Sequence, residues 1–178
     1  MKEFVSKTGK KFTLRSPLLS DLKGLYKFIS DLTAEDIYLL RGPEDSLTLK
    51  QEEKWLKGKL QQMREREVVI IDALFGEKIA GQVELEVGSF RGRFLGKIGV
   101  SIAKEFRGEG LGERLMQEIE AQAKKLKLKI LHLEVYVENK VAENLYKKMG
   151  YVEFGMLPGS IEYKGNMLDE KYLFKRID

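Results

Sequence analysis

The chain has 178 residues, of which 43% are hydrophobic and 34% charged, a composition typical of a globular protein that buries a core. It contains no cysteine, which excludes disulfides, thiolate metal sites and cysteine nucleophiles, and its single histidine argues against a metal centre. Its 32 basic and 28 acidic residues are interspersed, and the net charge of +4 suits a polyanionic cofactor but is too small to indicate nucleic-acid binding.

The first half of the chain predicts a strand, two helices and a hairpin. Residues 11–15 alternate in polarity like a strand, and Ser20 is a candidate N-cap for a helix that reaches about residue 30. Thr48 and Gln51 have the spacing of a capping box, which predicts the second helix. The runs 68–75 and 79–87 flank a glycine turn and predict a β-hairpin.

The next segment combines a strand, a glycine-rich turn and a helix. Apolar residues alternate over 98–102, and a 3.6-residue apolar period predicts a helix from about 110 to 127. The turn between them contains Arg107, Gly108, Gly110, Leu111 and Gly112. The first N–H groups of a helix have no internal partner and carry partial positive charge, so this arrangement favours phosphate binding. A flexible loop that enters a helix is the alternative interpretation.

The last third predicts a strand over 129–137, a short helix and two further strands. Val141 is expected on the apolar face of the short helix, which Gly150 would close at its C-terminus. The final strands, 151–156 and 167–174, are expected to flank a loop containing Pro158, Gly159 and Gly165. The order βααβββαβαββ predicts a mixed α/β (α+β) fold, a single domain over residues 1–178 with helices on a central sheet.

Two motifs in the expected order resemble one family. Arg107, Gly110 and Gly112, after a hydrophobic strand, resemble the acyl-CoA pyrophosphate loop, Arg/Gln-x-x-Gly-x-Gly/Ala, of the GNAT N-acetyltransferase superfamily. The downstream residues that continue the resemblance are Leu133-Glu134-Val135, Asn139, Ala142, Leu145-Tyr146 and Gly150-Tyr151. It implies a central, mostly antiparallel mixed sheet of about seven strands flanked by four helices, with acyl-CoA held where two strands separate.

The resemblance also implies a reaction and a donor. We expect acetyl-CoA-dependent transfer of an acetyl group to a primary amine, of a protein N-terminus or a small molecule, by direct attack in a ternary complex. Acetyl-CoA would contact the glycine turn, the strand backbone at Val100 and Ile102, and the side of the short helix that carries Asn139, Ala142 and Tyr146. Tyr146 would be the general acid that protonates the leaving thiolate. The alternatives are a packed helix tyrosine and, for Asn139, a helix N-cap.

The general base and the acceptor site are less defined. An alkyl amine has a pKa near ~10.4 and must lose a proton before it attacks. Glu84 and Glu86 share one strand face and are candidate bases, although a solvated strand face explains them equally well. Many members of the family carry a glutamate at about the position of Lys97. The residues expected near the acceptor are Tyr38, Arg41, Glu134 and Tyr136, with the late loop around 158–165.

Motifs that the sequence lacks bear on alternative functions and on the location of the protein. A non-catalytic acyl-CoA-binding sensor is the alternative function, since it would keep the glycine turn without needing Tyr146. His132 is expected to be a partly buried strand histidine, because no Gly-x-Ser-x-Gly motif accompanies it. No apolar run approaches the roughly 18 residues that span a bilayer, and residues 1–7 lack an apolar signal core. We therefore expect a cytoplasmic protein without a membrane or nucleic-acid partner; homodimerisation is left open.

Overall fold

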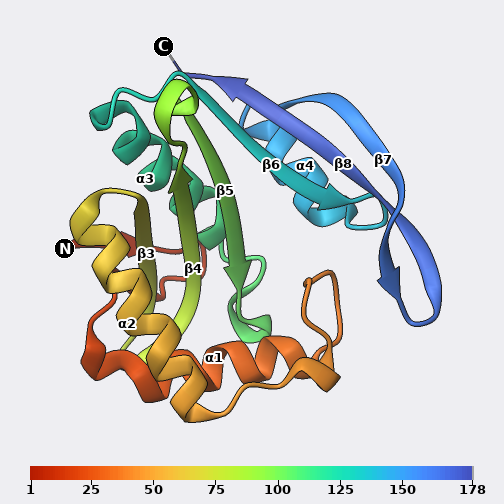
Figure 1. Ribbon diagram of the computed structural model, residues 1–178. Coiled ribbons are helices and arrows are strands. Elements are labelled where there is room, and N and C mark those ends of the chain that lie inside the picture. Colours follow the sequence, from red (N-terminus) through yellow and green to blue (C-terminus); the bar gives the residue numbers. More distant parts are fainter. Residues whose placement is uncertain (178) are drawn as a thin grey trace.

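The computed structural model describes residues 1–177, which contain one eight-stranded sheet and four α-helices (Figure 1). The strands are β1 (Lys2–Val5), β2 (Lys11–Arg15), β3 (Val68–Phe75), β4 (Lys78–Val87), β5 (Leu95–Ile102), β6 (Ile130–Tyr136), β7 (Val152–Tyr163) and β8 (Asn166–Arg176). The helices are α1 (Leu22–Ala34), α2 (Leu49–Glu65), α3 (Leu111–Lys125) and α4 (Lys140–Lys148). The mixed α/β class and the mostly antiparallel architecture are confirmed.

The sheet divides between β5 and β6. Its strand order is β1-β2-β3-β4-β5-β6-β8-β7, and every neighbouring pair is antiparallel except β5 and β6. These two strands pair in parallel only from Leu95 opposite Ile130 to Lys97 opposite His132. Beyond that point they diverge, as Figure 1 shows, so the second half of each strand has a main-chain edge without a strand partner. The expected separation of the two strands is therefore present.

Helices cover both faces of the first half of the sheet. Val83 and Leu85 of β4 are fully buried in the core that includes α3. The opposite face of β4 carries Glu84, which pairs with Lys59 of α2. A second buried cluster joins α1 and α2 to the sheet through Leu25, Phe28, Leu32, Leu56, Leu74 and Ile79. The alternation over 79–87 thus separates an apolar face from a polar face.

The N-terminal elements differ in two respects from the sequence prediction. The edge strand β1 was not predicted, because its residues are mostly exposed and show no hydrophobic period. Ser20 is not a helix N-cap: it lies in a short 3-10 turn, and α1 begins at Leu22. Asp21 organises this turn, since its carboxylate accepts a hydrogen bond from the Leu18 amide at 2.7 Å and binds Arg15. The capping box of α2, in contrast, forms as predicted.

The C-terminal hairpin is longer than its sequence suggests. The residues expected to form a late loop continue β7 up to a turn at Lys164 and Gly165. Pro158 is tolerated because β7 is an edge strand, where a missing N–H breaks no ladder bond. Gly159 has a φ of +58° beside a register shift, and its N–H donates to Asp169 at 2.8 Å. The expectation that Val141 lies on the apolar face of α4 is wrong, because its side chain is 83% exposed.

Among the described residues, no helix is both long enough and apolar enough to cross a bilayer.

Candidate active site

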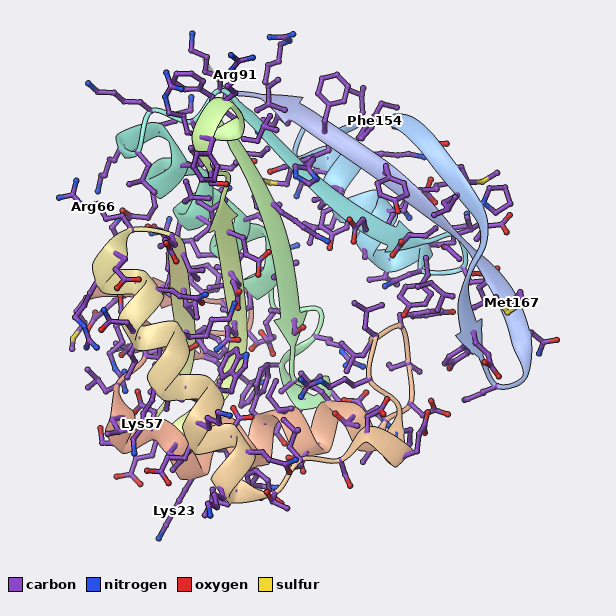
Figure 2. All side chains as sticks on the ribbon, in the orientation of Figure 1. Lys23, Lys57, Arg66, Arg91, Phe154 and Met167 are labelled. Atoms are coloured by element: carbon purple, nitrogen blue, oxygen red, sulfur yellow. The ribbon has the colours of Figure 1, made fainter. Side chains whose placement is uncertain are left out.

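The divergence of β5 and β6 opens a cleft of ≈ 430 Å³. Side chains from both halves of the sheet project into this space in Figure 2, whereas Phe154 and Met167 lie on the outer side of the β7–β8 hairpin. Residues singled out in the sequence that line the cleft are Tyr38, Glu84, Glu86, Val100, Glu134, Tyr136, Asn139, Ala142 and Tyr146. The fold therefore brings together side chains that are separated by up to about a hundred residues in the chain.

The glycine turn before α3 exposes a row of unpaired amides. Gly108 and Gly110 have φ values of +78° and +80°, a conformation that favours glycine, and Gly110 is the residue that precedes the helix. Within the described chain, the amides of residues 108–113 donate to no other residue, and the first paired N–H is that of Arg114, 3.1 Å from the Gly110 carbonyl. Six consecutive free donors at the positive end of a helix dipole suit a phosphate group.

Leu111 and Gly112 of this turn have packing roles. Leu111 is 1% exposed, so only its main chain is available to a ligand. A Cβ atom on Gly112 would lie 3.2 Å from Leu145 of α4 and 3.8 Å from Ile102. Gly112 therefore allows α4 to approach the start of α3 closely, which places the Tyr146 helix beside the cleft.

Charged side chains next to the turn are already paired. Two guanidinium nitrogens of Arg107 lie 2.7 and 3.1 Å from the carboxylate of Glu35, and its Nε donates to the Ile102 carbonyl at 3.1 Å. Glu109 is bound by Lys10 at 2.6 Å and Thr8 at 2.7 Å, and Lys10 lowers the pKa of its carboxyl to about 2. These contacts fix the turn against α1 and the β1–β2 hairpin. The Arg107 side chain is thus occupied by Glu35 and the Ile102 carbonyl, which leaves the main-chain amides as the free donors of the turn.

Tyr146 is a buried phenol that lines the cleft. Its side chain is 6% exposed, and burial raises the pKa of its phenol to about 12, so it stays protonated at neutral pH. Its ring centroid lies 6.2 Å from that of Tyr151, whose hydroxyl is buried away from the cleft. A protonated phenol at the edge of a cleft is a hydrogen-bond donor for developing negative charge.

Asn139 and Ala142 form the start of α4. The Asn139 side-chain oxygen accepts a hydrogen bond from the Ala142 amide at 3.1 Å, so the capping role expected for this asparagine is present. Both residues also line the cleft. Helix capping and contact with a ligand are therefore compatible at this position.

The β4 wall carries two carboxylates that share one cation. Lys59 of α2 bonds to Glu84 and lies 3.4 Å from Glu86. Burial raises the pKa of Glu84, and the Lys59 ammonium partly opposes that rise. The side chain of Glu86 is 55% exposed, whereas that of Glu84 is 20% exposed. Glu84 is thus the more enclosed carboxylate and the better placed to exchange a proton within the cleft.

The opposite wall adds a carboxylate that the sequence did not single out. Glu170 of β8 is 8% exposed, and burial, followed by the nearby charge of Glu134, raises its pKa. Glu134 forms an ion pair with Lys97 at 2.7 Å, where β5 and β6 begin to separate. Glu170 lies opposite Tyr136 because β8 is inserted between β6 and β7. Nothing in the local pattern of residues 167–174 indicates that insertion, so no sequence signal marked Glu170.

The loop between α1 and α2 extends toward the C-terminal hairpin (Figure 1) and contacts it through side chains. The Tyr38 ring packs against those of Tyr136 and Tyr163, at centroid distances of 5.7 and 6.1 Å. The Tyr163 hydroxyl donates to the Asp36 carbonyl, and Lys164 pairs with the Asp36 carboxylate at 3.1 Å. Arg41 follows in the same loop but lines neighbouring pockets rather than the cleft itself.

Comparison with known proteins identifies the family. The model of the acetyltransferase (GNAT) family matches residues 32–151. YwnH of Bacillus subtilis (strain 168) is 31% identical over 81 residues, which cover 46% of this chain and 50% of that protein; this chain thus spans about half the length of that curated relative. A GNAT-family acetyltransferase structure from Streptococcus pneumoniae superposes with a TM-score of 0.83 at 24% identity, covering 93% of this chain and 99% of that one.

A further solved structure of the same fold contains a ligand. The GNAT superfamily phosphinothricin acetyltransferase (Pat) from Sinorhizobium meliloti, solved in complex with acetyl-CoA, superposes with a TM-score of 0.80 at 16% identity. The superposition covers 93% of this chain and 88% of that chain. Because the family model matches well over half of the sequence, the chain belongs to the acetyltransferase (GNAT) family.

Proposed function

We propose that this protein transfers the acetyl group of acetyl-CoA to a primary amine bound in the cleft, by direct attack in a ternary complex. The observation that carries the proposal is the run of six free amides at residues 108–113, which follows in the chain the β5 residues 97–101 that line the cleft. Family membership and the acetyl-CoA complex of a related fold support the choice of donor.

The donor would lie along the separated edges of the sheet. The amides of the glycine turn are suited to its diphosphate. The main chain of β5 at Val100 and Ile102 has no strand partner on the β6 side, although Arg107 already binds the Ile102 carbonyl, and it is suited to the amide-bearing arm, much as a further strand would pair there. Bound in this way, acetyl-CoA supplies the thioester whose carbonyl is attacked and whose thiolate leaves. Leu111 and Gly112 offer only main chain at this point, so no side chain obstructs the approach.

Tyr146 would assist the departure of the thiolate. Its phenol is protonated because burial raises its pKa to about 12, and its residue lines the cleft wall formed by α4. A fixed donor facing a developing negative charge in an enclosed site stabilises the transition state.

Glu84 would accept the proton that the amine must lose. Its cross-strand neighbour is Gly99, and a Cβ atom built there meets nothing within 4 Å, so the side of β5 next to the carboxylate is open. Glu86, Glu134 and Glu170 surround the same space and favour a cationic acceptor. The acceptor is therefore expected to enter as an ammonium ion and to be neutralised at Glu84.

Thiol release from acetyl-CoA in the presence of an amine panel tests the proposal. We expect release to depend on an amine and to yield one equivalent of the N-acetyl product by mass spectrometry. A protein that binds acetyl-CoA but releases no thiol with amino acids, N-terminal peptides or alkyl amines would instead be a sensor of acyl-CoA.

A further inference from the structure

A second pocket adjoins the cleft on the side of the first two helices. It has a volume of ≈ 270 Å³ and is connected to the cleft through Leu39, Leu40 and Ser101, which line both. Its remaining apolar walls are Ile29, Leu32 and Trp55. A ligand in the cleft can therefore extend between α1 and α2 along a largely hydrocarbon surface.

One carboxylate is buried in this apolar pocket without a partner. Glu52 of α2 is 2% exposed, and its Oε1 atom accepts no hydrogen bond from any described residue. Glu52 takes part in no ion pair among the described residues. Arg41, which also lines the pocket, lowers the pKa of the Glu52 carboxyl through its charge, but less than burial raises it. Burial consequently raises the pKa of the Glu52 carboxyl. An unpaired carboxyl at such a position is costly to the fold, and a bound cation would offset that cost.

We propose that this pocket binds a second cationic group of the acceptor, so that the preferred acceptors are alkyl diamines. The inference rests on the acetyl transfer proposed above. One amine reacts in the cleft beside Glu84, the methylene chain passes Leu39 and Leu40, and the distal ammonium pairs with Glu52. The Trp55 ring forms part of the same wall, and its aromatic surface suits a cation: the Lys59 ammonium already lies 5.9 Å from the ring centroid.

Trp55 allows the proposal to be tested without catalysis, because it is the only tryptophan in the chain. Its fluorescence is titrated with diaminobutane, diaminohexane and diaminooctane, and with the monoamines of equal chain length, in the absence of acetyl-CoA. We expect the fluorescence change to saturate, with a Kd for the best diamine at least about tenfold lower than that for its monoamine. Only the diamine forms a charge-assisted hydrogen bond with Glu52. Equal affinities for the two series would overturn the proposal.

Substitution at Glu52 gives a second readout. The change Glu52→Gln keeps the shape of the side chain and removes its charge, and we expect it to weaken diamine binding about tenfold while leaving monoamine binding unchanged. Glu53→Gln is the matched control, because Glu53 is a neighbouring glutamate on the exposed side of α2 that pairs with Lys57 at 2.5 Å. An unaltered diamine affinity in Glu52→Gln would contradict the proposal; should that variant not fold, the wild-type comparison of the two amine series still decides.

Acetyl transfer measured with the same amines separates the two proposals. If monoamines and diamines are acetylated with equal kcat/KM and Trp55 does not respond, the diamine pocket is wrong and the acetyltransferase function stands. If Trp55 responds selectively to diamines but no amine is acetylated, the pocket stands and the proposed function is wrong.

Discussion

Glu84 of β4 lies directly opposite Gly99 of β5, and the missing side chain of the glycine leaves open space beside the carboxylate. No positive φ requires a glycine at residue 99. Backbone strain therefore does not explain this glycine, and we infer that it keeps Glu84 accessible from the cleft.

The substitution Gly99→Val should fill this space without disturbing the strand, because β-branched residues suit strands and a Cβ atom there meets nothing within 4 Å. The valine side chain would hold the amine away from Glu84. We therefore expect KM for the amine to rise at least about tenfold, as when a bound polar group is displaced from its partner. Affinity for CoA, measured by calorimetry, should be unchanged.

Gly155→Val is the control for that substitution. Gly155 is also a strand glycine with open space around its Cβ position, but it lies in β7 outside the cleft. It should leave KM for the amine unaltered. Similar KM values for Gly99→Val and wild type would show that Glu84 and Gly99 are not part of the acceptor site.

Loss of the Tyr146 hydroxyl should slow the chemical step. We expect Tyr146→Phe to lower kcat about a hundredfold with little change in KM for acetyl-CoA, because a general acid acts in the transition state. Tyr151→Phe is the matched control, since the Tyr151 hydroxyl is buried, unpaired and absent from the cleft lining. Equal kcat values for the two variants would rule out the acid role of Tyr146.

The pH profile should report the ion pair between Lys59 and Glu84. The lysine stabilises the charged carboxylate and so lowers its pKa; in Lys59→Met that pKa rises. Because the base must be deprotonated, the acid limb of kcat/KM should move up by about one pH unit. Lys57→Met, at an exposed lysine paired with Glu53, should leave the limb in place. An unshifted limb in Lys59→Met would exclude Glu84 as the base.

A buried carboxyl in β3 should make stability depend on pH. Asp72 is 0% exposed, its Oδ1 accepts from Gln82 at 2.8 Å, and burial raises its pKa from 3.8 to about 7. Between these values the native state binds a proton that the unfolded chain does not, so stability falls as pH rises from about 4 to about 7. Asp72→Asn, which keeps the acceptor for Gln82, should therefore be more stable than wild type at pH 8 by roughly 2–4 kcal/mol. At pH 4 the two should be nearly equal by denaturant titration, and a constant difference across pH would contradict this origin.

Local signals predicted most elements of the fold. The capping box at Thr48 and Gln51, the alternation around Glu84, and the glycine that ends α4 each depend on neighbours in sequence, and each is present in the structure. The edge strand β1 lacked such a signal because both its faces are largely exposed. The extension of β7 was missed because Pro158 and Gly159 normally interrupt strands.

The candidate site depends on pairings that no local pattern encodes. Glu170 enters the cleft only because β8 pairs with β6, and Glu52 is enclosed only because α2 packs beside α1. An ion pair of Arg107 was foreseeable for a charged residue on a surface turn, but its partner was not, since Glu35 is 72 residues away in the chain. The sequence pattern suggests that these charged residues are exposed, and only tertiary contacts determine their burial and their partners.

We expect the diphosphate of CoA to bind the amides at the start of α3. Titration calorimetry of CoA with Gly110→Glu tests it, with Gly76→Glu as control. Both glycines have positive φ, and a Cβ atom would meet only Phe4, at 3.8 Å, at residue 110 and nothing within 4 Å at residue 76. Gly76 lies in the β3–β4 turn, which contributes none of the free amides. We predict that Gly110→Glu weakens CoA binding at least about a hundredfold, or ~2.7 kcal/mol, while Gly76→Glu binds CoA like wild type. Wild-type affinity in Gly110→Glu, or an equal loss in both variants, would contradict the account.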